Sequence, residues 1–209
     1  MGLFILNAVK HCQISVKRWG GIESDYLDIH SFIDHTKNIC ADSRHRILHT
    51  EWGINHVVVP IFGHTLINSD GKHINVKDMC ERDHLLVDYQ NKFIPTLSDF
   101  VEAISDEEVD TQLGEKLDKF HNEHINDEKI SELMLTPLAY TGRLKSLLIT
   151  HNSWFINSIL PKIFSTKPIL KDFIIEPSVL FNAMEFELWM DNGMNYPKSS
   201  KKLEKKLIN

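Results

Sequence analysis

Apolar residues recur every three or four positions through the first sixty residues, which is the spacing of amphipathic helices. The first predicted helix ends before Gly20 and Gly21, whose permissive backbones allow a sharp turn. Ser24 is typical of the N-cap of a second helix, and Pro60 is expected to end the segment that contains the third. The predicted helices cover residues 4–17, 24–40 and 41 to at least 51.

The spacing changes to an alternation over about residues 65–76, where short apolar arms flank Asp70 and Gly71. An Asp-Gly pair between such arms is a strong signal for a turn between antiparallel strands, so this segment is predicted to form a β-hairpin. Helical spacing resumes after the hairpin, in segments that cover residues 78–89 and 96–104.

Further helices are predicted in the second half of the chain, where Pro and Asn residues separate apolar segments. They cover residues 106–124, 127–135, 138–150, 152–160 and 177–191. The predicted fold is therefore mainly α (α+β), with an N-terminal helical domain at residues 1–104 that carries one β-hairpin. An acidic stretch separates it from a C-terminal helical bundle at 105–194, and a Lys-rich tail at 195–209 is expected to be flexible.

Composition and charge narrow the class of protein. The 209 residues carry a formal net charge of -6, which argues against a general nucleic-acid binder. Cys12, Cys40 and Cys80 lack the CxxC spacing of a zinc ribbon and do not suggest a disulfide framework. The apolar run near the N-terminus is too short for a signal sequence or a membrane span, so we expect a cytoplasmic protein without a membrane contact.

Histidine is the unusual component, with 12 residues of which nine precede residue 90. Several of them share a helix face with carboxylates, because residues three, four and seven positions apart lie on the same side of a helix. Three predicted helices each carry such a triplet. The triplets are His30, Asp34 and Lys37; Asp42, His45 and His49; and Glu81, His84 and Asp88.

Imidazole and carboxylate are the ligands that zinc, manganese and iron prefer, so these faces predict a divalent metal site between helices. The predicted metal ligands are His45, His49, His84 and Asp88, with His30 as a further ligand. Glu81 or Asp34 is the predicted general base, and Arg44, Arg46 and Lys37 are the predicted clamp for an anionic substrate. The resulting hypothesis is a metal-dependent hydrolase of a phosphorylated or nucleotide-like small molecule.

A non-catalytic alternative explains the same residues. Buried histidines and carboxylates can form a hydrogen-bonded polar core or a ligand pocket without a metal, and Arg or Lys beside them can make ordinary surface pairs. In that case the chain is a phage- or defence-related protein that binds a small ligand, or another protein through its C-terminal helices. The motifs for HExxH, P-loop, GxGxxG and GxSxG sites are absent from the sequence.

Several short motifs occur in an order that resembles a small bacterial and phage family, known as a domain of unknown function, over about residues 8–104. They are Arg18-Trp19-Gly20-Gly21, Arg44-His45-Arg46-x-x-His49 and Glu81-x-x-His84-x-x-x-Asp88. The resemblance implies that these residues occupy the family's motif positions, and it carries no assigned activity. The chain departs from the family's pattern at residues 89–93, which replace a shorter, Gly-containing link.

Overall fold

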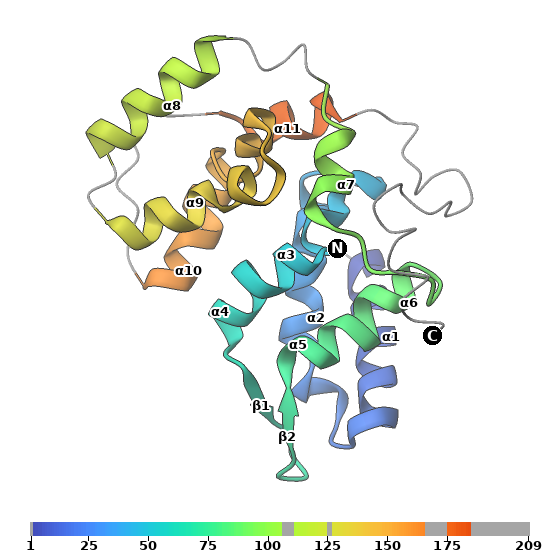
Figure 1. Ribbon diagram of the computed structural model, residues 1–209. Coiled ribbons are helices and arrows are strands. Elements are labelled where there is room, and N and C mark those ends of the chain that lie inside the picture. The colour runs from blue at the N-terminus through green and yellow to red at the C-terminus, as the bar shows by residue number, and fades with distance from the viewer. Residues whose placement is uncertain (1, 106–110, 125–126, 166–174, 185–209) are drawn as a thin grey trace, which may run out of the picture. The chain divides into compact units, whose positions relative to one another are not determined.

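The computed structural model describes residues 2–105, 111–124, 127–165 and 175–184 (Figure 1). The described residues are mainly helical and contain one two-stranded antiparallel sheet, which confirms the predicted fold class. Contacts divide the chain into two compact units, one built on Met1–Thr96 and the other on Leu97–Leu188. The predicted boundary at residue 104 stays a prediction, and the predicted flexible tail lies outside the described residues.

The first unit is built on α1 (Gly2–Trp19), which packs against α2 (Leu27–Ile33) and against η5 (Cys80–Leu85). Its buried positions follow helical spacing at Ala8, His11, Cys12 and Ser15, so two polar side chains enter the core together with the apolar ones. The segment from 24 to 40 is not the single helix that the sequence predicts. It consists of η1 (Glu23–Asp25), α2 and η2 (His35–Asn38).

The predicted third helix is also divided. Asp42 caps the 3₁₀ helix η3 (Ser43–Leu48) by accepting a hydrogen bond from the backbone of Arg44. Thr50 then caps a second helix, made of α3 (Glu51–Gly53), the π-helical η4 (Ile54–Val58) and α4 (Val59–Phe62). Pro60 lies inside this helix rather than at its end. The wide π turn before it provides room for a ring that would otherwise clash with the preceding turn.

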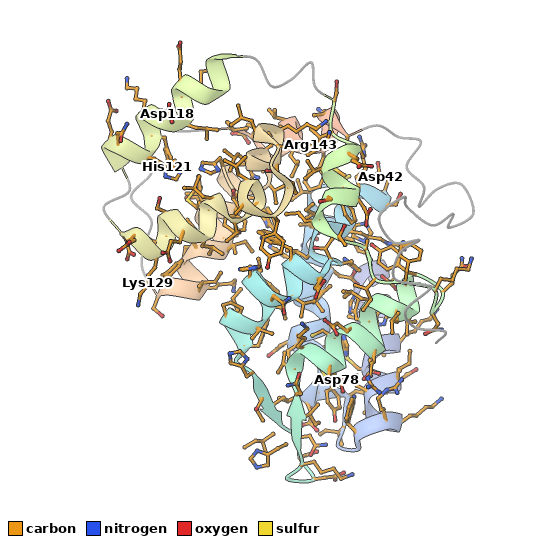
Figure 2. The ribbon with its side chains drawn as sticks, viewed as in Figure 1. Asp42, Asp78, Asp118, His121, Lys129 and Arg143 are labelled. Atoms are coloured by element: carbon orange, nitrogen blue, oxygen red, sulfur yellow. The ribbon has the colours of Figure 1, made fainter. Side chains whose placement is uncertain are left out.

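The hairpin pairs β1 (Thr65–Ile67) with β2 (His73–Asn75) in antiparallel register, with Leu66 opposite Ile74. It leads into one continuous helix formed by α5 (Val76–Met79), η5 and α6 (Leu86–Asp88). Asn75 caps this helix by accepting a hydrogen bond from the backbone of Asp78, which is labelled in Figure 2.

The hairpin turn also holds the Gly20-Gly21 turn in place. The Asp70 carboxylate accepts a hydrogen bond of 2.8 Å from the Gly21 backbone, and the Asn68 amide donates to the Trp19 carbonyl. Gly21 has a φ of 72°, and a Cβ at this position would collide with the Asp25 carboxylate and lie 3.0 Å from the Asn68 amide. A side chain is therefore excluded both by the backbone conformation and by the neighbouring groups.

The second unit consists of α-helices that alternate along the sequence with short 3₁₀ and π-helical segments. They are α7 (Leu97–Glu102), α8 (Thr111–His124), α9 (Glu128–Thr141), η7 (Leu144–Ile149), η8 (Phe155–Ile159), α10 (Leu160–Phe164) and α11 (Pro177–Ala183). Its core is aromatic and aliphatic, with Phe120, Met134, Leu148 and Phe155 almost completely buried. In the part of the chain described, no helix has the length and apolar character that a membrane span requires.

Two histidines face each other within this second unit. His121 of α8 (Figure 2) lies with its Nε2 2.8 Å from Nε2 of His151. The Nδ1–H of His151 donates to the Leu147 carbonyl at 3.0 Å, so its Nε2 accepts from His121. Burial, and after it the neighbouring His121, lowers the pKa of His151 to about 3.

We predict that replacing Gly21 by Ala destabilises the protein far more than replacing Gly71 by Ala. Both glycines have positive φ, but a Cβ at Gly71 meets no atom within 4 Å. The Gly71 substitution therefore shows the backbone strain alone, about 1 kcal/mol, and the Gly21 substitution adds a steric clash of roughly 1–3 kcal/mol. Urea unfolding measures both free energies, and equal losses would contradict this account of the turn.

We also predict that His151 makes the stability depend on pH. Its pKa is about 3 in the folded protein and about 6.5 in the unfolded chain, so protonation favours unfolding and stability falls as the pH drops from about 6.5 toward 3. The His151→Gln variant should lose less stability between about pH 7 and pH 5, by up to about 2 kcal/mol. Thermal unfolding followed by tryptophan fluorescence measures this difference, and parallel curves would refute the prediction.

Candidate metal centre

Four potential ligands from three separate segments converge in the first unit. Asp34 follows α2, His49 ends η3, His84 lies in η5 and Asp88 ends α6. One ligand atom from each lies within 4.8 Å of the others. The Nε2 atom of His49 is 3.3 Å from Asp34 Oδ1 and 3.2 Å from Asp88 Oδ2, and the Nε2 atoms of His49 and His84 are 3.1 Å apart.

These distances can be compared with what a metal ion requires. Ligands about 2.0–2.1 Å from a tetrahedral zinc ion lie about 3.3–3.4 Å from one another. Three of the ligand separations are 3.1–3.3 Å, and the separations of His84 Nε2 from the Asp34 and Asp88 oxygens are 3.7 and 3.9 Å. These five separations therefore lie within about 0.6 Å of the tetrahedral value, and all four atoms lie within 4.8 Å of one another.

Burial and charge favour the protonation states that metal ligands need. Burial acts to raise the pKa of Asp34, but the neighbouring side chains of His49 and His84 outweigh it and lower this pKa, so the carboxyl group is ionised. Asp88 is held ionised in the same way against its burial, by His11 and His49. Burial lowers the pKa of His84 to about 3, which leaves its imidazole neutral. Ionised carboxylates and neutral imidazoles are the forms that bind metal.

Three polar atoms of the four-residue cluster have no hydrogen-bond partner. They are the two carboxylate oxygens of Asp34 and Nδ1 of His49, all buried. An unsatisfied buried oxygen of a charged carboxylate costs free energy, which a bound cation would recover. Lys37 supplies part of the compensation, since its Nζ lies 2.5 Å from Asp34 Oδ1.

The other two predicted ligands lie beside the four. His45 donates through Nδ1 to the Asp42 carbonyl, and its buried Nε2 lies 3.9 Å from Asp34 Oδ1 with no hydrogen-bond partner. Burial lowers the pKa of His45 to about 3, so this nitrogen carries a free lone pair. His30 lies behind His84, with the two Nδ1 atoms 3.0 Å apart, and is not in the ligand group.

The residues predicted as base and clamp have other partners. Glu81 lies 3.6 Å from Lys77, outside the four-residue group. Arg44 donates through Nε and one terminal nitrogen to the two oxygens of Asp42, and Arg46 lies over the Tyr89 ring. Asp34, the alternative base, is itself one of the four converging groups. Each of these roles therefore stays a prediction. The residues that converge are the potential metal ligands, and the predicted substrate-binding arginines have partners elsewhere.

The π-helical turn explains why Glu81 is separated from His84 and Asp88. In an α-helix the three residues share one face, but i→i−5 bonding over Cys80–Leu85 changes the phase of the helix. Asp83 is fully buried as a result, while Glu81 is only partly buried. Sequence spacing based on 3.6 residues per turn could not show this change.

Sequence reasoning also missed His11, which contacts the cluster, and Ser15 and Asp83, which are linked to it through His30. His11 stacks on His84 with ring centroids 3.9 Å apart, and its Nε2 lies 3.2 Å from Asp88 Oδ1. Ser15 lies 3.0 Å from His30 and donates to Asp83. The signal was present in the four-residue spacing of His11 and Ser15, which places both on the buried face of α1.

The fold and this cluster define a mainly helical domain with a buried group of two histidines and two aspartates that could hold a metal ion. Residues 6–109 match the family model Domain of unknown function (DUF6915), so this part of the chain belongs to that family. The match confirms the expected resemblance to a domain of unknown function, whereas the family's motif positions and its bacterial and phage origin stay predictions. No curated protein and no solved structure matches the chain.

Proposed function

We propose that the DUF6915 domain of this chain binds one divalent transition-metal ion through Asp34, His49, His84 and Asp88. The observation that carries the proposal is the convergence of two imidazole Nε2 atoms and two carboxylate oxygens, buried together at separations close to those of a tetrahedral site. A nitrogen and oxygen ligand set suits zinc, manganese or iron rather than the softer ions that prefer thiolates.

The ligand set supports a role in holding the fold together. Asp34, His49 and the helix that carries His84 and Asp88 are far apart in the sequence, so one ion would cross-link three segments of the first unit. Four protein ligands also complete a tetrahedral shell, which is the arrangement of a structural site. His45, with its free Nε2, is the nearest candidate for a fifth ligand.

We predict that protein purified without a histidine tag binds one equivalent of zinc, manganese or iron and is stabilised by it. A concentration of about one hundred times the Kd should add about 2.7 kcal/mol to the free energy of unfolding. His49→Ala and Asp88→Ala should abolish stoichiometric binding, because each removes one of four ligands. Metal analysis and thermal shift measure these effects.

Two histidines outside the site provide controls for this experiment. His73→Ala alters an exposed histidine of β2, and His151→Gln alters a buried one in the second unit. Both variants should bind metal as the wild type does. The proposal fails if the wild type neither contains metal nor shows a thermal shift with any of the three ions.

A hydrolytic role is the second candidate, and one observation favours it. The side chain of Asp88 is 17% exposed, whereas those of His49 and His84 are completely buried and that of Asp34 nearly so. If Asp88 yields its position to water, the ion would face solvent on that side, and a metal-bound water has a strongly lowered pKa. A phosphorylated or nucleotide-like small molecule is the substrate class that the sequence predicts.

For this second candidate we expect metal-loaded wild-type protein to hydrolyse para-nitrophenyl phosphate or nucleoside monophosphates. Turnover should disappear when metal is removed and in Arg46→Ala, if that guanidinium group binds the substrate, while Arg46→Ala keeps its metal. Release of phosphate is the measurement. A protein that holds stoichiometric metal but shows no turnover of these substrates would contradict the hydrolase and leave the structural site intact.

A further inference from the structure

The geometry points to Asp83, Ser15 and His30 as positioning residues that fix the tautomer of His84, so that its Nε2 lone pair faces Asp34 and Asp88. This inference rests on the proposed metal site, because it states how one ligand of that site is prepared. The four side chains form one buried line of hydrogen bonds, with successive distances of 2.9, 3.0 and 3.0 Å.

The direction of this line is set at Asp83. Its carboxylate can only accept hydrogen bonds, and three donors from one end of α1 surround it. Arg18 donates to Oδ1 at 2.6 Å, while Trp19 and Ser15 donate to Oδ2 at 2.7 and 2.9 Å. Asp83 is therefore the fixed acceptor at the start of the line, and the Arg-Trp pair of the sequence motif holds it there.

The next two bonds follow from counting protons. The hydroxyl group of Ser15 has one proton, which goes to Asp83, so Ser15 must accept from Nε2–H of His30. His30 is completely buried, which favours the neutral ring, and a neutral ring with its one proton on Nε2 has none on Nδ1. This Nδ1 therefore accepts a hydrogen bond from Nδ1–H of His84.

This order of hydrogen bonds determines the state of Nε2 of His84, the proposed ligand atom. His84 with its proton on Nδ1 has a lone pair on Nε2, which lies 3.1 Å from His49 Nε2, 3.7 Å from Asp34 Oδ1 and 3.9 Å from Asp88 Oδ2. In the metal-free protein the donor that can face these acceptors is Nε2–H of His49, and a bound cation would replace that proton. Hydrogen bonds to the remote nitrogen also orient the ring and raise its basicity as a ligand. His84 is thus prepared for metal before any metal binds.

The sharpest test is Asp83→Asn made in a Trp19→Phe background, which keeps the shape of residue 83 but can reverse the line. Without the Trp19 N–H at the Oδ2 position, the Asn amide can accept from Arg18 through its oxygen and donate to Ser15, which then donates to Nε2 of His30. His30 would carry its proton on Nδ1 and donate to His84, whose own proton would move to Nε2. We expect ¹⁵N NMR of the metal-free protein to show Nδ1–H for His84 in the wild type and Nε2–H in the variant.

Metal affinity is the second measurement. Blocking Nε2 in the Trp19→Phe, Asp83→Asn double variant should weaken zinc binding on the order of 10–100-fold, although all four ligands remain. Ser15→Ala interrupts the line without reversing it, and should give a mixture of His84 tautomers with an intermediate loss. Ser146→Ala, which removes an equally buried hydroxyl group in the second unit, is the matched control and should change neither value.

Two results would overturn the inference. One is an Nε2–H tautomer of His84 in the metal-free wild type, and the other is an unchanged tautomer in both the double variant and Ser15→Ala. If the double variant does not fold, Ser15→Ala decides the question alone. The NMR measurement needs no metal, so a wild type that binds no metal would refute the proposed function while the tautomer still tests the positioning line.

Discussion

The burial of two aspartates among histidines is the constraint on which the first unit depends. Transferring an ionised carboxylate from water into a protein interior is costly unless charges or hydrogen bonds compensate for it. Asp34 is 4% exposed and Asp88 is mostly buried, yet their histidine neighbours keep the pKa of both low. Lys37 neutralises one carboxylate in part, and a divalent ion would neutralise what remains.

The local structure of each segment explains why the side chains of the cluster lie close together. The 3₁₀ helix capped by Asp42 carries His45 and ends directly before His49, and the π turn in the helix after the hairpin turns Asp83 inward. The Gly20-Gly21 turn ends α1 directly after Arg18 and Trp19, so their donors reach Asp83. The irregular helical segments thus position the residues of the candidate site, and π-helical turns are frequent at functional sites.

Much of the metal cluster could be predicted from the sequence, because His84 and Asp88 share a helix face and His49 lies on another polar face. Asp34 was predicted as a general base, and the structure places it among the four. The separation of Glu81 could not be predicted, since helical spacing assumes a regular turn. The line through Ser15 and Asp83 depends on the packing of α1 against η5, which no local pattern contains.

X-ray absorption spectroscopy of the metal-loaded, untagged protein tests the central claim most directly. With zinc, the account predicts nitrogen and oxygen neighbours at about 2.0–2.1 Å, and outer-shell scattering from two imidazole rings. Sulfur neighbours at about 2.3 Å, or a shell without imidazole scattering, would contradict a site made by Asp34, His49, His84 and Asp88.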